Sequence, residues 1–379
     1  MRNLFTSESV SEGHPDKICD QISDAILDEV LKQDPNAKVA CETFATTNYL
    51  LIGGQISTTA IVDYEKVARD VLRKIGYNND DYGINAETCR IELRIEEQSH
   101  DIALGIDLTE QLIGAGDQGI MFGYATNESK TYLPLAITIA HELVYTASKL
   151  RKQKTFKWAR PDMKSQVTID YTDLENPKIN TILMSIQHDA DFNDAEFKAY
   201  IKSNIMDKVA LDFGLNTDFK VLINPTGRFV IGGPQGDTGL TGRKIIVDTY
   251  GGYARHGGGA FSGKDSTKVD RSAAYMARYA AKNLVAAGLA DKIEIQVSYA
   301  IGVAEPVSIF VETFGTEKIA KESILKALDE NFDFSVYNLI KELDLRKPVF
   351  LKTSTYGHFG KADFSWEKLD KVEVLRKYL

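Results

Sequence analysis

The same order of predicted helices and strands recurs three times in this 379-residue chain. This recurrence limits the possible folds more than any other feature of the sequence. Each time, a long segment with apolar residues at three- and four-residue spacing is followed by alternating segments that predict strands, and then by a second helical segment. The sequence therefore predicts three structurally similar α+β units without sequence identity between them. The long helices are predicted at 16–33, 133–152 and 271–290, the strands at 38–57, 90–97, 166–171, 179–188, 219–225, 292–302 and 306–314, and the second helices at 64–76, 195–214 and 318–332.

The first long helix carries two stripes of different character. Apolar residues recur every four positions, and four aspartates recur with the same spacing about 200° away around a helix of 3.6 residues per turn. We therefore expect this helix to pack against the rest of the protein on one face only. The apolar stripe is Ile18, Ile22, Ile26 and Val30, and the acidic stripe is Asp16, Asp20, Asp24 and Asp28.

Glycine-rich stretches at 114–119 and 232–242 interrupt the periodic pattern and suggest where the units meet. If helices cover one face of each sheet, the other face must pack on another domain or on another subunit, because a half-covered apolar sheet is not soluble. We therefore expect an oligomer whose sheets pack at domain and subunit interfaces. The predicted division is an N-terminal α+β domain at 1–100, a linker at 101–111, a central α+β domain at 112–229 and a C-terminal α+β domain at 230–379.

Composition and charge exclude several classes of protein. Hydrophobic residues make up 43% of the chain, which is ordinary for a globular protein. The formal net charge of −9 argues against nucleic acid as a partner, because a polyanion would be repelled. Cys19, Cys41 and Cys89 lack a CxxC spacing, so we expect neither a disulfide framework nor a zinc ribbon, and a cytoplasmic location fits best. The start of the chain has no apolar signal core, and the most apolar stretch, at 132–140, is too short for a bilayer, so neither secretion nor a membrane span is expected.

The segment GGGAFSGKD at 257–265 is one residue short of the P-loop pattern that cradles phosphates. Asp265 stands where a P-loop needs a hydroxyl for Mg²⁺, and no strand leads directly into the loop, so a Walker ATPase is disfavoured. A glycine-rich loop with a lysine still suits a phosphate, because bare backbone N–H groups can approach an anion closely. A tight surface turn explains the glycines equally well, and Lys264, Lys268 and Asp270 shift the balance toward a ligand site.

Three further segments contain candidate site residues. SEGHPDK at 11–17 places His14 and Asp16 at the start of the first long helix, where a helix cap is the stronger interpretation although the pair also suits phosphate and Mg²⁺. GAGDQG at 114–119 encloses Asp117 between glycines, for which a turn is the alternative. GRFVIGGPQGDTGLTGRK at 227–244 combines an aromatic ring, a carboxylate and two cations in a loop of the kind that serves ligands.

Other polar residues have an ordinary explanation. A lysine before a strand, such as Lys164, is solvated by default. His141, His188, His256 and His358 lack metal-ligand spacing, and we interpret them as structural or exposed.

Taken together, SESVSEGHPDK, GAGDQG, GRFVIGGPQGDTGLTGRK and GGGAFSGKD resemble the S-adenosylmethionine synthetase family in order and approximate spacing, and the resemblance extends to STYGHFG at 354–360. The family's fold, three similar α+β domains in a pseudo-threefold arrangement, agrees with the recurrence in the sequence. The resemblance implies that the sulfur of methionine attacks C5′ of ATP, and that the bound tripolyphosphate is then hydrolysed to pyrophosphate and phosphate. A departing triphosphate needs preplaced cations rather than a strong protein nucleophile.

The resemblance also implies roles for individual residues, with opposite charges matched across the methionine site and an aromatic face beside the adenosine. Catalytic roles fall to His14, Asp117, Lys164, Arg243, Lys244 and Lys264. ATP contacts fall to His14, Asp162, Lys164, Arg228, Phe229, Asp237, Arg243, Lys244, Ala260 and Lys264, and methionine contacts to Gln55, Gln98, Asp237 and Lys268. Asp16 and Asp270 would hold two Mg²⁺ ions, and Glu42 would belong to a K⁺ site.

One departure from the family's pattern concerns methionine. Gln55 occupies a position where the family usually has Glu beside the methionine ammonium, so the ionic part of that contact is lost. The segment SHDIALGID at 99–107 matches the family's mobile gate, so the linker 101–111 is also expected to act as a gating loop that excludes water.

The sequence leaves two alternative functions open, and the resemblance suggests one oligomeric assembly. An ATPase or kinase that cuts between phosphates would use the same lysines and magnesium but leaves the residues matched to methionine unexplained. A catalytically silent nucleotide-binding subunit is motivated by Gln55 alone. The resemblance further implies a homotetramer, a dimer of dimers, with active sites at the dimer interface.

Overall fold

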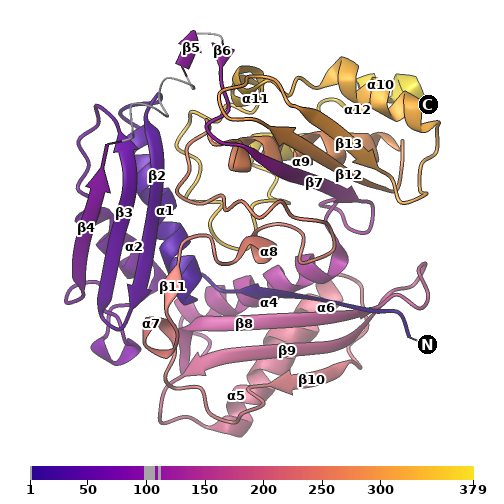
Figure 1. The fold of residues 1–379 in the computed structure, drawn as a ribbon. Helices are drawn as coiled ribbons and strands as arrows, with labels where there is room; N and C mark the ends of the chain where they lie inside the picture. The colour runs from indigo at the N-terminus through magenta and orange to yellow at the C-terminus, as the bar shows by residue number, and fades with distance from the viewer. Residues whose placement is uncertain (1, 98–106, 110–111) are drawn as a thin grey trace.

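Three sheets surround a central group of long helices in the computed structural model, which describes residues 2–97, 107–109 and 112–379 (Figure 1). The arrangement confirms the predicted α+β class with three similar units. The first sheet has the strand order β11 (Gly239–Leu240), β2 (Lys38–Thr46), β3 (Tyr49–Ser57), β4 (Arg90–Glu96), the second β1 (Leu4–Val10), β8 (Ala159–Asp170), β9 (Lys178–His188), β10 (Lys220–Ile223), and the third β7 (Gly119–Thr126), β12 (Lys292–Tyr299), β13 (Ser308–Glu312). A small ribbon pairs β5 (Asp107–Thr109) with β6 (Leu112–Ile113), and the rest of the expected gate lies outside the described residues.

The first two sheets have the same topology. In each, two consecutive strands form an antiparallel hairpin, β2–β3 or β8–β9, and a later strand, β4 or β10, adds in parallel to its second member. The third sheet keeps the antiparallel hairpin β12–β13. The strands predicted at these positions are therefore confirmed, because local alternation of apolar and polar residues is enough to indicate them.

Each sheet also takes one strand from a distant part of the chain. Strand β1 pairs antiparallel with β8, β7 pairs with β12, and β11 pairs with β2. The sequence analysis did not predict these three strands. Each of these strands is followed in the chain by the long helix of another unit. The segment between strand and helix therefore runs from one unit to the next (Figure 1).

The predicted helices are present with shifts of a few residues at their ends. The long helices are α1 (Pro15–Leu31), α4 (Leu135–Lys152) and α9 (Val269–Ala287), and they pack on the inner faces of the three sheets (Figure 1). The second helices are α2 (Tyr64–Ile75), α10 (Lys321–Asn331), and α5 (Asp194–Ile201) continued through a π-helical turn (Lys202–Asp207) into α6 (Lys208–Asp212). The remaining helical turns are α7 (Gly233–Gly236), α8 (Ile245–Asp248), α11 (Val336–Glu342), α12 (Val372–Leu375), Asp80–Tyr82, Ser365–Glu367 and Arg376–Tyr378.

Helix α1 corrects one expectation from the sequence. Its apolar stripe packs into the core as predicted, but its four aspartates are also buried, with at most 8% of any residue exposed. The prediction that α1 packs on one face only is wrong, because loops from the C-terminal part of the chain cover the acidic stripe. Cys19, Cys41 and Cys89 are free and buried. In the part of the chain that the structure describes, no helix combines the length and apolar character needed to cross a membrane.

Candidate active site

Most of the predicted site residues fall into two groups near β2. We call the first group the helix-end cluster, because it surrounds the N-terminus of α1, and the second the sheet-face cluster, because it lies on the outer face of the first sheet. The helix-end cluster contains His14, Asp16, Asp162, Lys164, Asp237, Arg243 and Lys244. The sheet-face cluster contains Glu42, Gln55, Lys264, Lys268 and Asp270.

Pairing between β1 and β8 builds one side of the helix-end cluster. Val10, the last residue of β1, lies opposite Lys164, and the N–H of Ser11 donates to the carbonyl of Met163 at 2.9 Å. The chain then passes so close to β8 that a Cβ at Gly13 would lie 2.3 Å from the carbonyl oxygen of Pro161. The glycine of the SEGHPDK motif therefore permits the close approach that brings His14 toward Lys164.

His14 is the N-cap of α1. Its Nδ1 accepts the backbone N–H of Asp16 at 3.1 Å, so in the neutral ring the proton lies on Nε2. Burial lowers the pKa of His14 well below its usual value, and the positive charges of Lys244, Lys164, Lys17 and Arg243 lower it further. The cap expected from the sequence is thus confirmed, and it presents a neutral imidazole with one free N–H donor.

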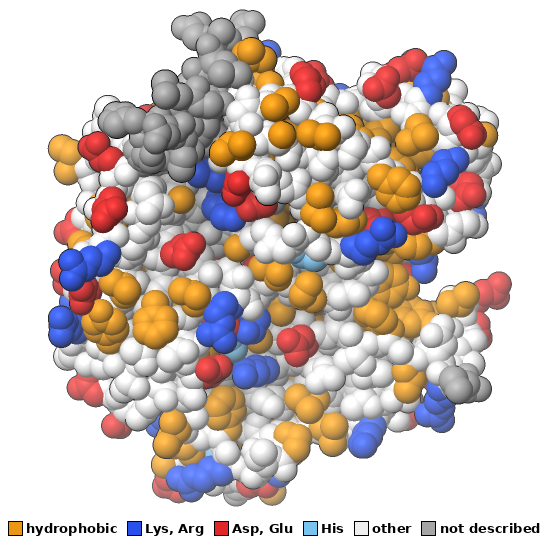
Figure 2. Space-filling view, in the orientation of Figure 1, with side chains coloured by type: hydrophobic (Ala, Val, Ile, Leu, Met, Phe, Trp, Pro, Cys, Tyr) orange, Lys and Arg blue, Asp and Glu red, His pale blue; other side chains and the backbone are white. Residues whose placement is uncertain are grey.

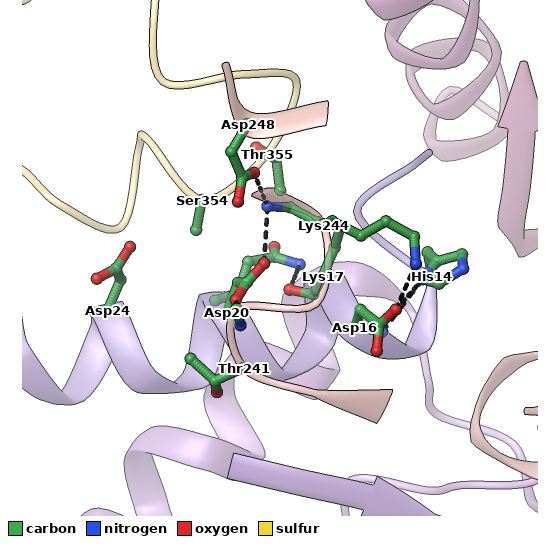
Figure 3. A network of polar contacts seen from close by, with 12 residues as sticks. His14, Asp16, Lys17, Asp20, Asp24, Thr241, Lys244, Asp248, Ser354 and Thr355 are labelled. Atoms are coloured by element: carbon green, nitrogen blue, oxygen red, sulfur yellow. Dashed lines mark hydrogen bonds and ion pairs between the residues drawn. The ribbon is translucent and has the colours of Figure 1, made fainter. Parts of the chain in front are cut away.

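Asp16 connects the start of α1 to the glycine-rich loop after β11. Its Oδ2 accepts from the ammonium of Lys244 at 2.5 Å, and its Oδ1 accepts the backbone N–H of Leu240 at 3.0 Å (Figure 3). The Nε of Arg243 lies 3.7 Å from the same carboxylate, and about half of its side chain is exposed. Two cations are therefore held next to His14, and Figure 2 shows basic and acidic side chains together near the middle of this face of the molecule.

Asp162 closes the other side of the cluster. Its Oδ2 accepts the backbone N–H of Gly233 at 2.9 Å, while its buried Oδ1 has no hydrogen-bond partner among the described residues. Burial and, to a smaller extent, the charge of Asp237 raise the pKa of Asp162 to about 6, although the Gly233 N–H, Lys164 and Lys244 act to lower it. Asp162 therefore ties the loop at 227–244 to β8 and leaves one acceptor oxygen for a ligand.

Phe229 and Arg228 border this cluster at the ends of β9 and β10. The backbone of Phe229 bonds twice to His188, through its N–H to Nε2 at 3.0 Å and through its carbonyl to the His188 N–H at 2.9 Å. A Cβ at Gly232 would lie 2.8 Å from the ring of Phe229, so the loop folds directly over that ring. His188 is therefore structural, as expected.

The sheet-face cluster is built on strands β2 and β3. Lys264 forms an isolated antiparallel bridge with Ala40 of β2. On the other side of β2, Ala40 pairs with Gln55 of β3. Paired residues point to the same face, and residues two apart on a strand do too, so Glu42 shares this face. Helix α1 covers the opposite face, where Val39 and Cys41 are buried. Glu42 and Gln55 are both exposed.

The remaining members come from the turn before α9. The ammonium of Lys264 lies 2.7 Å from the carboxylate of Asp270, and that of Lys268 lies 2.5 Å from Asp265. A Cβ at Gly259 would lie 2.2 Å from Oδ1 of Asp270, which explains the glycine at this position of the loop. Asp117 is exposed in the neighbouring loop, which is joined to this turn by a bond from the Gly116 N–H to the Thr267 carbonyl.

Ala260 lies where the two clusters approach each other. Its Cβ would be 2.4 Å from a Cβ at Gly242, the residue before Arg243. The helix-end cluster nevertheless lies on the side of the first sheet that α1 covers, and the sheet-face cluster on the outer side. The expected methionine contact Gln98 lies outside the described residues.

The sequence analysis missed a buried polar network beneath both clusters. Lys17 is fully buried and bonds to Asp20 at 2.8 Å and to Asp248 at 2.5 Å (Figure 3). Arg271, also buried, forms a two-point ion pair with Asp24. The four-residue spacing of the aspartates was the available signal. Apart from Lys17, their partners lie more than 200 residues away, which spacing along one helix cannot reveal.

Comparisons with known proteins agree with this arrangement. Models of the S-adenosylmethionine synthetase N-terminal, central and C-terminal domains match residues 2–100, 112–229 and 231–368. An S-adenosylmethionine synthase of Mesoplasma florum is 83% identical over the full length of both chains. The S-adenosylmethionine synthases of Mycoplasma capricolum and Clostridium botulinum are 79% and 54% identical, covering all of this chain and 97% and 100% of their own. The chain therefore belongs to the S-adenosylmethionine synthetase family.

Proposed function

We propose that the protein transfers the adenosyl group of ATP to the sulfur of L-methionine and then hydrolyses the bound tripolyphosphate to pyrophosphate and phosphate. The observation that carries this proposal is the helix-end cluster, in which a neutral histidine and three cations meet at the start of α1 in a chain of this family. An enzyme that cuts between phosphates is not favoured by the family comparisons.

The first step is a displacement at carbon. A lone pair on the methionine sulfur forms the S–C5′ bond while the C5′–O5′ bond breaks, and the bonding electrons leave with the triphosphate. Negative charge therefore grows on O5′ and the phosphates, so fixed cations stabilise the transition state more than the ground state. We assign this task to Lys164, Arg243 and Lys244 of the helix-end cluster and to Lys264 of the sheet-face cluster.

His14 acts beside the breaking bond as a neutral hydrogen-bond donor. Its Nδ1 is occupied by the N–H of Asp16, so Nε2–H is available for an oxygen of the triphosphate. A donor with a strongly lowered pKa keeps this role across neutral pH, because the ring does not change charge. Asp162, Arg228, Phe229 and Ala260 border the site proposed for the nucleoside, and Phe229 offers a stacking face.

Methionine would be bound by charge matching. We assign Lys268 to its carboxylate, Asp237 to its ammonium, and Gln55 and Gln98 to hydrogen bonds nearby. Asp117, exposed in the loop beside the sheet-face cluster, completes the proposed active site.

The carboxylates suit magnesium bound together with substrate. Among residues 2–97, 107–109 and 112–379, no three His, Cys, Asp or Glu side chains converge as a metal cage. Magnesium on a polyphosphate usually needs only one or two carboxylates. Asp16 accepts from the ammonium of Lys244 at 2.5 Å and Asp270 from that of Lys264 at 2.7 Å, and these contacts with positive charge support the assignment. We propose that they hold two Mg²⁺ ions, which neutralise charge on the triphosphate when bound, and that the exposed Glu42 supplies an oxygen to K⁺.

We further propose that each active site combines the helix-end cluster of one chain with the sheet-face cluster of a second chain, within a homotetramer of two such dimers. The two clusters of a single chain lie on opposite sides of the first sheet, which supports this division. The outer side of the third sheet also exposes Ile120 at 44% and Phe310 at 45%, which favours burial against another subunit. A cytoplasmic location accords with three free cysteines.

Product analysis tests the proposal directly. The purified protein is incubated with ATP, methionine, Mg²⁺ and K⁺, and the products are identified by mass spectrometry. S-adenosylmethionine with pyrophosphate and phosphate supports the proposal. ADP or AMP without a sulfonium product would instead indicate cleavage between phosphates, and ATP binding without turnover would indicate a silent subunit.

A further inference from the structure

The acidic stripe of α1 holds three separate loops by the same type of contact. Each aspartate accepts at least one backbone N–H from a segment more than 200 residues away. The bonds run from Leu240 to Asp16 at 3.0 Å, from Gly242 to Asp20 at 2.8 Å, from Gly263 to Asp24 at 2.8 Å, and from Phe350 and Leu351 to Asp28 at 2.9 Å each.

Two of these loops carry the cations of the proposed site. Leu240 and Gly242 precede Arg243 and Lys244, and Gly263 precedes Lys264. Successive aspartates four residues apart are displaced by about 6 Å along a helix that rises 1.5 Å per residue. Helix α1 therefore sets the spacing between the two cation-bearing loops, whereas Asp28 holds a loop that contains no residue of the proposed site.

The contact at Asp24 is the most elaborate. Arg271 approaches its two carboxylate oxygens at 2.7 and 3.0 Å, and both residues are at most 1% exposed. The same guanidinium donates to the carbonyl of Lys264 at 3.2 Å and to the hydroxyl of Thr353 at 2.9 Å. Asp24 and Arg271 thus hold the backbone of Lys264 from both sides, through the N–H that precedes it and through its own carbonyl.

We infer that Asp24, paired with Arg271, is a positioning residue that fixes Lys264 for its contact with the triphosphate. This inference rests on the proposed function of Lys264. A displacement of about 1 Å in a positioned group can reduce a rate by as much as a hundredfold, so a change in this buried pair affects the site without touching substrate. Gly263 adds to the constraint, because a Cβ there would lie 1.9 Å from the carbonyl oxygen of Cys41.

Asp24→Asn tests the inference, with Asp28→Asn as the matched control. Both substitutions remove one buried carboxylate charge from the same face of α1. For Asp24→Asn we expect kcat to fall and the KM for ATP to rise, so that kcat/KM for ATP falls by about tenfold or more, while the KM for methionine changes less than about twofold, because the phosphate contact alone is displaced. For Asp28→Asn we expect both KM values to stay within about twofold of wild type. A purely structural role would lower the fraction of active enzyme, and therefore kcat, equally in both variants and leave both KM values unchanged. That outcome would overturn the inference.

Arg271→Lys provides a second variant, should Asp24→Asn fail to fold. Lysine keeps the positive charge but cannot bridge Asp24 and the carbonyl of Lys264 as a planar fork does. We expect the same rise in the KM for ATP, and an unchanged value would contradict the inference.

Binding of inorganic tripolyphosphate, measured by calorimetry, separates this inference from the proposed function. If the wild-type protein makes no S-adenosylmethionine, the proposed function fails. Tripolyphosphate affinity then decides the positioning role, which requires weaker binding in Asp24→Asn and Arg271→Lys than in Asp28→Asn. Equal affinity in all three variants, or no binding by the wild type, would overturn it.

Discussion

At the scale of single residues, burial controls the charge of the histidine at the start of α1. His14 is 1% exposed and is surrounded by cations, so the folded protein does not protonate it at the pH where the unfolded chain does. Its folded pKa is lowered, so its contribution to stability is present above about pH 6.5 and is lost as the pH falls below that value. A neutral ring therefore matters for folding as well as for the proposed donation to a phosphate oxygen.

This linkage predicts a difference between wild type and His14→Gln. Glutamine can replace the ring's hydrogen bonds but cannot bind a proton in the unfolded chain. Between about pH 7 and about pH 5.5, we expect the free energy of unfolding to fall by about 1 kcal/mol more in the wild type than in the variant. Urea unfolding at both pH values measures the difference. Equal pH dependence in the two proteins would show that folding does not lower the pKa of His14.

A second residue-scale prediction concerns Gln55. It is exposed on the outer face of the first sheet, in the same row as Ala40 and Lys264. A carboxylate at this position would add an ionic contact to the methionine ammonium, so we expect Gln55→Glu to lower the KM for methionine about tenfold. Steady-state kinetics check this result, with an unaltered KM for ATP as the internal control. A KM for methionine that stays the same or increases would contradict the assignment of Gln55.

At the scale of elements, two glycines of the loop at 257–265 differ in the space that a side chain would have. Gly258 and Gly263 both have positive φ, at 95° and 80°, but only Gly263 lacks space for a side chain. A Cβ at Gly263 would overlap the carbonyl oxygen of Cys41, whereas a Cβ at Gly258 would meet nothing within 4 Å. The loop is therefore held against β2 at Gly263 and is open at Gly258.

The matched pair Gly263→Ala and Gly258→Ala tests this distinction. We expect Gly258→Ala to lower the free energy of unfolding by about 1 kcal/mol, which is the cost of a left-handed backbone for alanine. For Gly263→Ala we expect a loss of at least about 3 kcal/mol, because backbone atoms must also move. Urea denaturation measures both values. Similar losses of stability in the two variants would mean that the close approach to Cys41 does not restrict the residue at position 263.

The same elements show what the sequence could predict and what it could not. The three long helices and the strands of the hairpins were predicted because their signals are local: apolar spacing on α1, α4 and α9, and alternation on the strands. Strand β11 was missed because it has two residues and no period, and β1 and β7 because their partners lie far away in the chain. The motif glycines were predicted from the glycine-rich segments, and the roles of the cations from the resemblance to the family. Nothing in the sequence around Asp24 or Arg271 indicates that the two residues pair, so only the structure reveals this ion pair.

At the scale of the whole molecule, the three units cannot be separated without breaking sheets. Each sheet depends on a strand supplied by a distant segment, and the core around α1 continues without interruption into the core around α9. The buried pair of Asp24 and Arg271 joins these two helices directly. Loops that carry cations of both clusters are therefore anchored to the same helix, α1.

The proposed sharing of active sites between chains is testable by mixing variants. Lys244→Ala disables the helix-end cluster and Lys264→Ala disables the sheet-face cluster, and we expect each alone to lower kcat/KM by about a hundredfold or more. If sites combine clusters from two chains, a mixed dimer contains one site with both clusters intact. Random reassortment of equal amounts makes half of the dimers mixed, so activity should recover to about a quarter of the wild-type level.

The control for this experiment mixes Lys244→Ala with His14→Ala, both in the helix-end cluster, so that no combination of chains restores a complete site. Activity in that mixture should stay at the level of the separate variants. If the Lys244→Ala and Lys264→Ala mixture also stays there, although exchange of chains is verified by mass spectrometry, the sites do not draw on two chains. The two clusters of one chain would then have to serve the same triphosphate around the edge of β2, and loop movement near the Gly242–Ala260 contact would be required to bring them together.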